Sequence, residues 1–154
     1  MELTRNNVCT EPNRATTGKY GILVADDEEG VRGVLAIGMR QHGFDVWLAA
    51  DGQQALDLYR RHGESIDVVL LDVRMPGRDG PQTLAALQQL NPRVRCCFMS
   101  GDFDCYNEEG RCYTEERLRD MGAAAVIPKP FRLDQIGQML CQLVSKADLS
   151  PSIL

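Results

Sequence analysis

Short apolar runs alternate along the chain with stretches whose apolar residues recur at helical spacing. The apolar runs lack the alternation of a half-exposed strand and are too short for helices, so they predict buried strands. The five predicted strands cover residues 22–25, 46–49, 68–71, 96–99 and 124–127. Helical spacing predicts a helix after each strand, marked by Val31, Val34, Leu35 and Met39, by Ala55, Leu58 and Tyr59, by Leu84, Leu87 and Leu90, by Leu118 and Met121, and by Leu133, Ile136, Leu140, Leu143 and Val144.

This order of elements predicts an α/β fold. Strands that are apolar throughout need cover on both faces, and helical crossovers between parallel strands supply that cover. Right-handed crossovers leave few topologies, and we expect a doubly wound, flavodoxin-like sheet of five parallel strands in the order 2-1-3-4-5, with helices on both faces. In such a sheet the functional site lies beyond the carboxyl ends of the strands.

Composition narrows the class of protein. The chain has 154 residues, 44% hydrophobic and 25% charged, which is typical of one globular domain. We expect a flexible N-terminal tail at 1–19, a folded domain at 20–145 and a C-terminal tail at 146–154. The net charge of −5 disfavours direct binding to nucleic acid or anionic membranes. No apolar run suits a membrane span, and the first residues lack a signal peptide's apolar region, so we expect a cytoplasmic protein.

Six cysteines are present without Cys-x-x-Cys spacing. Cys96 and Cys97 fall in a predicted strand, where a reduced thiol behaves as a small hydrophobic group. We therefore expect buried, reduced thiols there, and leave the role of Cys105 and Cys112 open.

Chemistry-bearing residues follow four of the five strands. Asp26 and Asp27 follow the first, Asp72 the third, the Ser100–Gly101 pair the fourth, and Lys129, between two prolines, the fifth. Three carboxylates against one ammonium leave an excess of negative charge, for which Mg²⁺ is a natural counter-ion and Mn²⁺ a substitute. The glycine-rich loops that hold nucleotide phosphates are missing from the sequence.

Each of these features has an ordinary structural explanation when taken alone. An acidic pair after a strand can cap a helix, and a Ser–Gly pair is common in turns. Their coincidence at four strand ends favours a functional site over unrelated turns.

Together these segments resemble the receiver domains of two-component response regulators. The matching segments are Val24–Glu28, Leu70–Gly80, Met99–Gly101 and Pro128–Phe131, and the resemblance extends over about residues 20–145. It implies that Asp72 accepts a phosphoryl group from a histidine kinase or a histidine phosphotransfer protein. It also implies that the domain changes its affinity for a downstream protein when phosphorylated.

The resemblance implies a role for each site residue. Asp27, Asp72 and the backbone carbonyl of Arg74 would bind Mg²⁺ directly, and Asp26 would act through water. Lys129 and the Ser100 hydroxyl would contact the phosphoryl oxygens. Gly101 would keep the approach to phosphorus open, and the bond between Lys129 and Pro130 would be cis.

Three features depart from the usual receiver pattern. Val126 stands where receivers usually carry an aromatic switch residue, so the output surface is expected to differ. Between Ser100 and Lys129 lie 28 residues, several more than usual, and the excess falls near 104–113. Its cysteines could form a bridge, bind a partner or flank a polar loop. Arg74 and Asp102 could form an ion pair that restricts water at the pocket mouth, or be unrelated surface charges.

Alternatives to a phosphorylated switch remain at this point. One is a pseudo-receiver that docks partners without phosphorylation, and a less favoured one is a Mg²⁺-dependent aspartyl phosphohydrolase. Such hydrolases usually place a second aspartate two residues after the nucleophile, where this chain has Arg74. We expect a stand-alone receiver that is not an enzyme beyond its own phosphorylation and dephosphorylation. A homodimer through the face of residues 114–121, 124–127 and 133–144 is compatible with the resemblance. The cognate kinase, the target and the lifetime of the phosphorylated state stay open.

Overall fold

The computed structural model describes residues 20–101 and 113–149. The strands are β1 (Tyr20–Ala25), β2 (Phe44–Ala49), β3 (Val68–Asp72), β4 (Cys96–Ser100) and β5 (Ala123–Pro128). The helices are α1 (Glu29–Gln41), α2 (Gly52–His62), α3 (Gly80–Leu90), α4 (Glu115–Asp120) and α5 (Leu133–Leu149), with a short 3₁₀ turn at Gly63–Ser65. The predicted N-terminal tail, Asp102, Cys105 and Cys112 lie outside the described residues.

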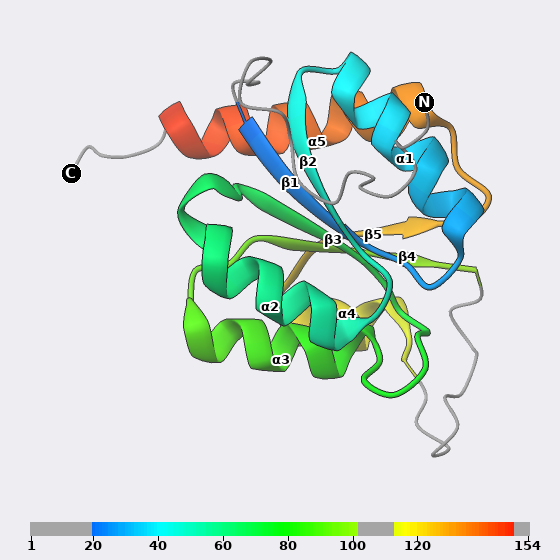
Figure 1. The fold of residues 1–154 in the computed structure, drawn as a ribbon, viewed down its shortest axis with the longest axis vertical. Coiled ribbons are helices and arrows are strands. Elements are labelled where there is room, and N and C mark those ends of the chain that lie inside the picture. The colour runs from blue at the N-terminus through cyan, green and yellow to red at the C-terminus, as the bar shows by residue number, and fades with distance from the viewer. Residues whose placement is uncertain (1–19, 102–112, 150–154) are drawn as a thin grey trace, which may run out of the picture.

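The five strands form one parallel sheet in the order β2-β1-β3-β4-β5, as the sequence predicted. Figure 1 shows α1 and α5 on one face and α2, α3 and α4 on the other. Each face has its own apolar core: Leu35, Met39 and Leu140 belong to the first, and Leu56, Leu84 and Leu118 to the second. The sheet is therefore covered on both sides, and its carboxyl edge is left to carry the site.

Local signals position the helices that lead to and from this edge. Asp51, Asp79 and Thr114 cap the N-termini of α2, α3 and α4, and each side chain accepts a hydrogen bond from the backbone N–H three residues later. Gly43 and Gly122 follow α1 and α4 with φ of +91° and +113°. Glycine adopts this left-handed conformation without a side-chain penalty, so it lets both helices end in tight turns.

The structure corrects one detail of the sequence prediction and shows where two of the residues that mark helices lie. Val34 is 49% exposed and Leu90 43% exposed, because the inward stripes of α1 and α3 run through neighbouring residues such as Leu35 and Leu87. The C-terminal tail does not begin at residue 146: α5 continues to Leu149. Residues 145–149 include neither Gly nor Pro, so nothing ends the helix before the residues that precede Pro151.

One other prediction is confirmed. Cys96 and Cys97 are buried free thiols, as expected from their place in β4. Within the part of the chain that is described, no helix combines the length and apolarity needed to cross a bilayer.

Candidate functional site

The site lies where β1, β3, β4 and β5 reach the carboxyl edge of the sheet. Asp26 directly follows β1, Asp72 and Ser100 are the last residues of β3 and β4, and Lys129 directly follows β5. Because Asp72 pairs in register with Met99, and Ser100 with Pro128, the parallel strands bring these residues to one level. Residues up to 103 positions apart in sequence are thereby brought together.

Three carboxylates converge at this edge. One oxygen from each of Asp26, Asp27 and Asp72 can be chosen so that all lie within 4.8 Å of one another. Asp26 is fully buried and Asp72 is 7% exposed, whereas Asp27 is exposed. The cluster thus has two oxygen donors set in the protein and one that faces solvent, which leaves room for water in a coordination shell.

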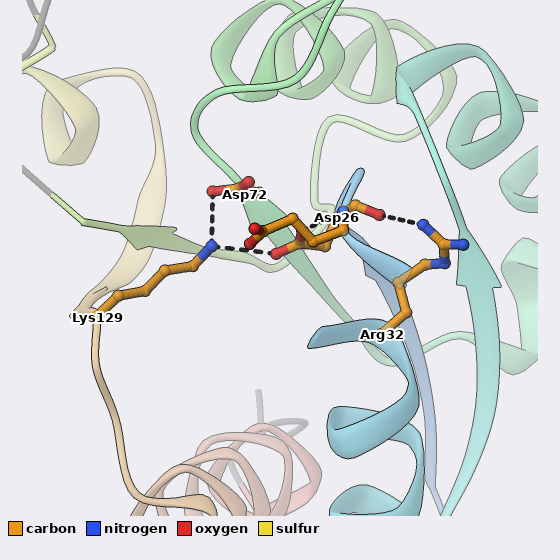
Figure 2. A network of polar contacts seen from close by, with 5 residues as sticks. Asp26, Arg32, Asp72 and Lys129 are labelled. Carbon is orange, nitrogen blue, oxygen red and sulfur yellow. Dashed lines mark hydrogen bonds and ion pairs between the residues drawn. The ribbon is translucent and has the colours of Figure 1, made fainter. Parts of the chain in front are cut away.

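Lys129 bridges the two buried carboxylates. Its Nζ donates to Asp26 Oδ2 at 3.2 Å and to Asp72 Oδ1 at 3.3 Å. Figure 2 shows the side chain reaching across from the end of β5 so that the ammonium lies between the two acids. The backbone holds this reach, since Lys129 N–H donates to the Ser100 carbonyl at 2.9 Å.

The electrostatics of Asp72 differ from those of an ordinary aspartate. Burial, the largest cause, and the negative charge of Asp26 together raise the pKa of its carboxyl to about 6, even though Lys129 opposes both. Burial alone would lower the pKa of the Lys129 ammonium, but Asp72 and Asp26 outweigh burial and raise it above its ordinary value. The ammonium of Lys129 therefore does not cancel the combined effect of burial and of the neighbouring carboxylate on Asp72.

Asp26 is held more firmly than its neighbours. Its Oδ1 accepts from the Glu28 N–H at 2.9 Å, and its backbone N–H donates to the Ala49 carbonyl at 3.1 Å. Arg32 Nη1, from the first turns of α1, donates to the Asp26 carbonyl at 2.8 Å (Figure 2). These bonds tie the end of β1 to β2 and α1, so the orientation of Asp26 is set before any ligand arrives.

The remaining residues that the sequence predicted for the site differ in burial and lie on different elements. Ser100 is 5% exposed at the end of β4, and Gly101 follows it on the surface, where an added Cβ would meet no heavy atom of the described chain within 4 Å. Arg74 is exposed in the loop after β3, and Val126 is buried in β5. The Lys129–Pro130 bond is cis, the isomer that the sequence resemblance implies. The pair of Arg74 with Asp102 stays a prediction, since Asp102 lies outside the described residues.

The loop from β3 to α3 is packed directly against the end of β3. Gly80 N–H donates to the Val73 carbonyl at 2.9 Å, and a Cβ at Gly80 would collide with the Asp72 carbonyl oxygen and come within 2.9 Å of Val73 Cα. Only glycine allows this approach. The loop that carries Arg74 is therefore closed back onto the backbone of Asp72.

Sequence reasoning missed two residues near this loop. Asp79 caps α3 in a capping box with Gln82, and its Oδ2 accepts from the hydroxyl of Tyr113 at 3.1 Å. The spacing of Asp79 and Gln82 is a recognisable signal for a helix start. The sequence carried no signal for Tyr113, because its contact joins positions 34 apart.

The arrangement suits a divalent cation bound by oxygen. Three carboxylates with a single ammonium carry an excess negative charge, and hard oxygen donors with room for water match the preferences of Mg²⁺. The raised pKa of Asp72 is the observation that tests this fit: burial and the charge of Asp26 both disfavour the ionised carboxylate, and a bound cation would favour it.

Comparison with known proteins finds related sequences over most of the chain. The family model described as the response regulator receiver domain matches residues 22–141. The chain is 33% identical over 138 residues to the sensor kinase CckA of Brucella abortus, covering 86% of this chain and 13% of that protein. It is 32% identical over 117 residues to the sporulation initiation phosphotransferase F of Bacillus subtilis, covering 75% of this chain and 86% of that protein.

Solved structures show the same fold. The CheX–CheY–BeF3–Mg²⁺ complex of Borrelia burgdorferi contains a chain that matches with a TM-score of 0.71 at 26% identity, over 86% of this chain and 94% of that one.

Proposed function

The chain belongs to the family of response regulator receiver domains, and from that membership we propose that it is a phosphorylation-activated signalling switch whose phosphoacceptor is Asp72. The observation that carries the proposal is that the ammonium of Lys129 donates hydrogen bonds to both Asp72 and Asp26, with the carboxylate of Asp27 beside them. Receiver domains in general are signalling modules rather than enzymes acting on separate substrates.

We propose that Asp27, Asp72 and the carbonyl of Arg74 hold Mg²⁺, with Asp26 acting through bound water. The cation would neutralise charge on the transferring phosphoryl group. Asp26 is the best fixed of these groups, because Glu28 N–H and Lys129 both bond its carboxylate. Mn²⁺ has the same preference for oxygen donors and would substitute.

The transfer begins from the ionised Asp72 carboxylate. One oxygen attacks phosphorus of a phosphohistidine on the partner, an O–P bond forms, and the N–P bond breaks. The electron pair of that bond returns to the imidazole nitrogen, and the histidine is regenerated. Lys129 is already within hydrogen-bond distance of the attacking carboxylate, so a small movement brings its ammonium to a phosphoryl oxygen. The Ser100 hydroxyl is proposed to contact another.

The phosphorylated state is proposed to end by hydrolysis of the acyl phosphate. A water oxygen attacks phosphorus, the O–P bond to Asp72 breaks, and the products are inorganic phosphate and the free carboxylate. While it lasts, the acyl phosphate carries about −1.5 to −2 charge at the end of β3, where the ionised carboxylate carried a single negative charge. We propose that this charge draws Lys129 and Ser100 toward it and thereby changes the affinity for a downstream protein.

The proposed phosphoryl donor is a histidine kinase or a histidine phosphotransfer protein. The names of two relatives support this partner class, since one is a sensor kinase and the other a phosphotransferase. A structure of a relative with BeF3 and Mg²⁺ supports the ligand chemistry. We propose a cytoplasmic location, in keeping with free thiols in β4. A homodimer through α4, β5 and α5 remains a proposal of the same kind.

The test is incubation with Mg²⁺ and acetyl phosphate, followed by the mass of the intact protein. We expect one phosphoryl group per chain in the parent and in Asp57→Asn, which changes an exposed acid on α2, and none in Asp72→Asn. Omission of the cation should abolish the adduct. An unmodified parent with Mg²⁺ bound would favour the pseudo-receiver, and repeated turnover of phosphate esters would favour the phosphohydrolase.

A further inference from the structure

Tyr113 and Thr114 form a short segment directly before α4, and Tyr113 contacts a second segment, the β3–α3 loop of residues 73–79 that follows Asp72. The Tyr113 hydroxyl donates to Asp79 Oδ2 at 3.1 Å, and the tyrosine is 4% exposed. A buried bond to a carboxylate is among the stronger hydrogen bonds in a protein, so this contact is a firm link between the segments.

The tyrosine is fixed by more than its hydroxyl. Its ring belongs to the apolar core under α2, α3 and α4, together with Leu84, Leu118 and Val126. The guanidinium of Arg117 lies 5.7 Å from the centre of the ring. These contacts fix the position of the Tyr113 ring and therefore of its hydroxyl.

Asp79, which is held by Tyr113, is connected through Gly80 to the backbone of Asp72. Its second oxygen, Oδ1, accepts from the Gln82 N–H at 2.9 Å and sets the start of α3. The next residue, Gly80, packs against the Asp72 carbonyl and donates to the Val73 carbonyl. A displacement of Asp79 would thus move the backbone that carries the proposed ligands.

We propose that Tyr113 is a positioning residue of the metal site, acting through Asp79 to hold the β3–α3 loop in the conformation that binds Mg²⁺. This inference rests on the proposed function, because it assigns a role toward the Mg²⁺ site described above. It goes further by placing part of the affinity in a residue that touches neither the cation nor the phosphoryl group. Loss of the link lets the loop sample other conformations, so binding must then order the loop at the expense of affinity.

The test compares Tyr113→Phe with Tyr59→Phe. Tyr59 is a matched control: it is 6% exposed in the same apolar core, and its hydroxyl accepts a hydrogen bond from Asn91 Nδ2 at 3.0 Å, at the opposite end of α3 from Asp79. Each substitution removes one buried hydroxyl, and both should lower the melting temperature by about 2–8 °C. The affinity for Mg²⁺ is measured by calorimetry on the full chain, well below either melting temperature.

We expect Tyr113→Phe to bind Mg²⁺ about fivefold or more weakly than the parent, and Tyr59→Phe to bind it as the parent does. Equal affinity in the parent and Tyr113→Phe, or equal loss in both variants, would overturn this inference and leave the proposed function standing. A parent that binds no Mg²⁺ would overturn the proposed function and this inference with it.

A second variant tests the route through Asp79. If Tyr113 acts through Asp79, then adding Tyr113→Phe to Asp79→Asn should weaken Mg²⁺ binding less than Tyr113→Phe does alone, because the altered link is shared. Asparagine keeps an oxygen to cap α3, so this background retains the helix start. Independent, additive losses would show that Tyr113 does not act through Asp79 and would overturn the proposal.

Discussion

Asparagine in place of Asp72 is expected to stabilise the protein at neutral and higher pH. The carboxyl has a pKa of about 6 in the folded chain, against 3.8 for a free aspartate. Because the folded state binds the proton more tightly, ionisation of Asp72 opposes folding. The parent should therefore lose stability as the pH rises from about 4 to about 6, and the full penalty is present above pH 6.

The size of the effect follows from the shift. About two pH units at 1.36 kcal/mol each give about 3 kcal/mol. Asp72 has only 10% of its side chain exposed, so solvent screening reduces this little. We expect Asp72→Asn to exceed the parent by about 2–3 kcal/mol in free energy of unfolding at pH 8, and by almost nothing at pH 4.

The assay is urea denaturation without divalent cations, followed by the fluorescence of the single tryptophan, Trp47. Asp57→Asn on the surface of α2 serves as the control and should show no such pH-dependent gain. Saturating Mg²⁺ should stabilise the parent more than Asp72→Asn, because the cation binds the ionised cluster. The reasoning is refuted if Asp72→Asn is no more stable than the parent at pH 8, or if its gain persists at pH 4.

Three further predictions concern the neighbourhood of the site and the core. Gly80→Ala should destabilise the fold by about 2 kcal/mol or more and weaken Mg²⁺ binding, because the added Cβ would collide with backbone atoms. The control, Gly30→Ala, adds a Cβ in open space on α1 and should stabilise the fold by about 0.5–1 kcal/mol. Equal effects of the two substitutions in urea denaturation would contradict the prediction for Gly80. Lys129→Met should lower the free energy of unfolding by about 1–3 kcal/mol at pH 8. The loss should be smaller at pH 5, where the Asp72 carboxyl is already protonated in the folded protein. A loss independent of pH would argue against the ion pair between Lys129 and Asp72. Burial raises the pKa of Cys97 to about 12 and that of Cys96 well above normal, so mass spectrometry should find both unlabelled by a thiol reagent until the protein unfolds.

The predicted site residues differ in how far sequence could place them. Asp72, Ser100 and Lys129 each follow a recognisable strand, so the rule that parallel strands end at one edge was enough to bring them together. Sequence could not assign the ammonium of Lys129 to two acids at once, since that depends on side-chain reach across β4. Helical spacing also did not show that Val34, one of the residues that mark α1, is exposed, because periodicity alone does not say where the buried stripe ends.

The sequence by itself determined where the strands and helices of this protein form. Apolar runs specified the strands and capping side chains the helix starts, because these depend on neighbours within a few positions. The tertiary structure decided the rest: which carboxyl became hard to ionise and which distant tyrosine holds the loop beside it. The raised pKa of Asp72 and the bond from Tyr113 to Asp79 both arise from burial and from groups far away in sequence, which no local pattern encodes.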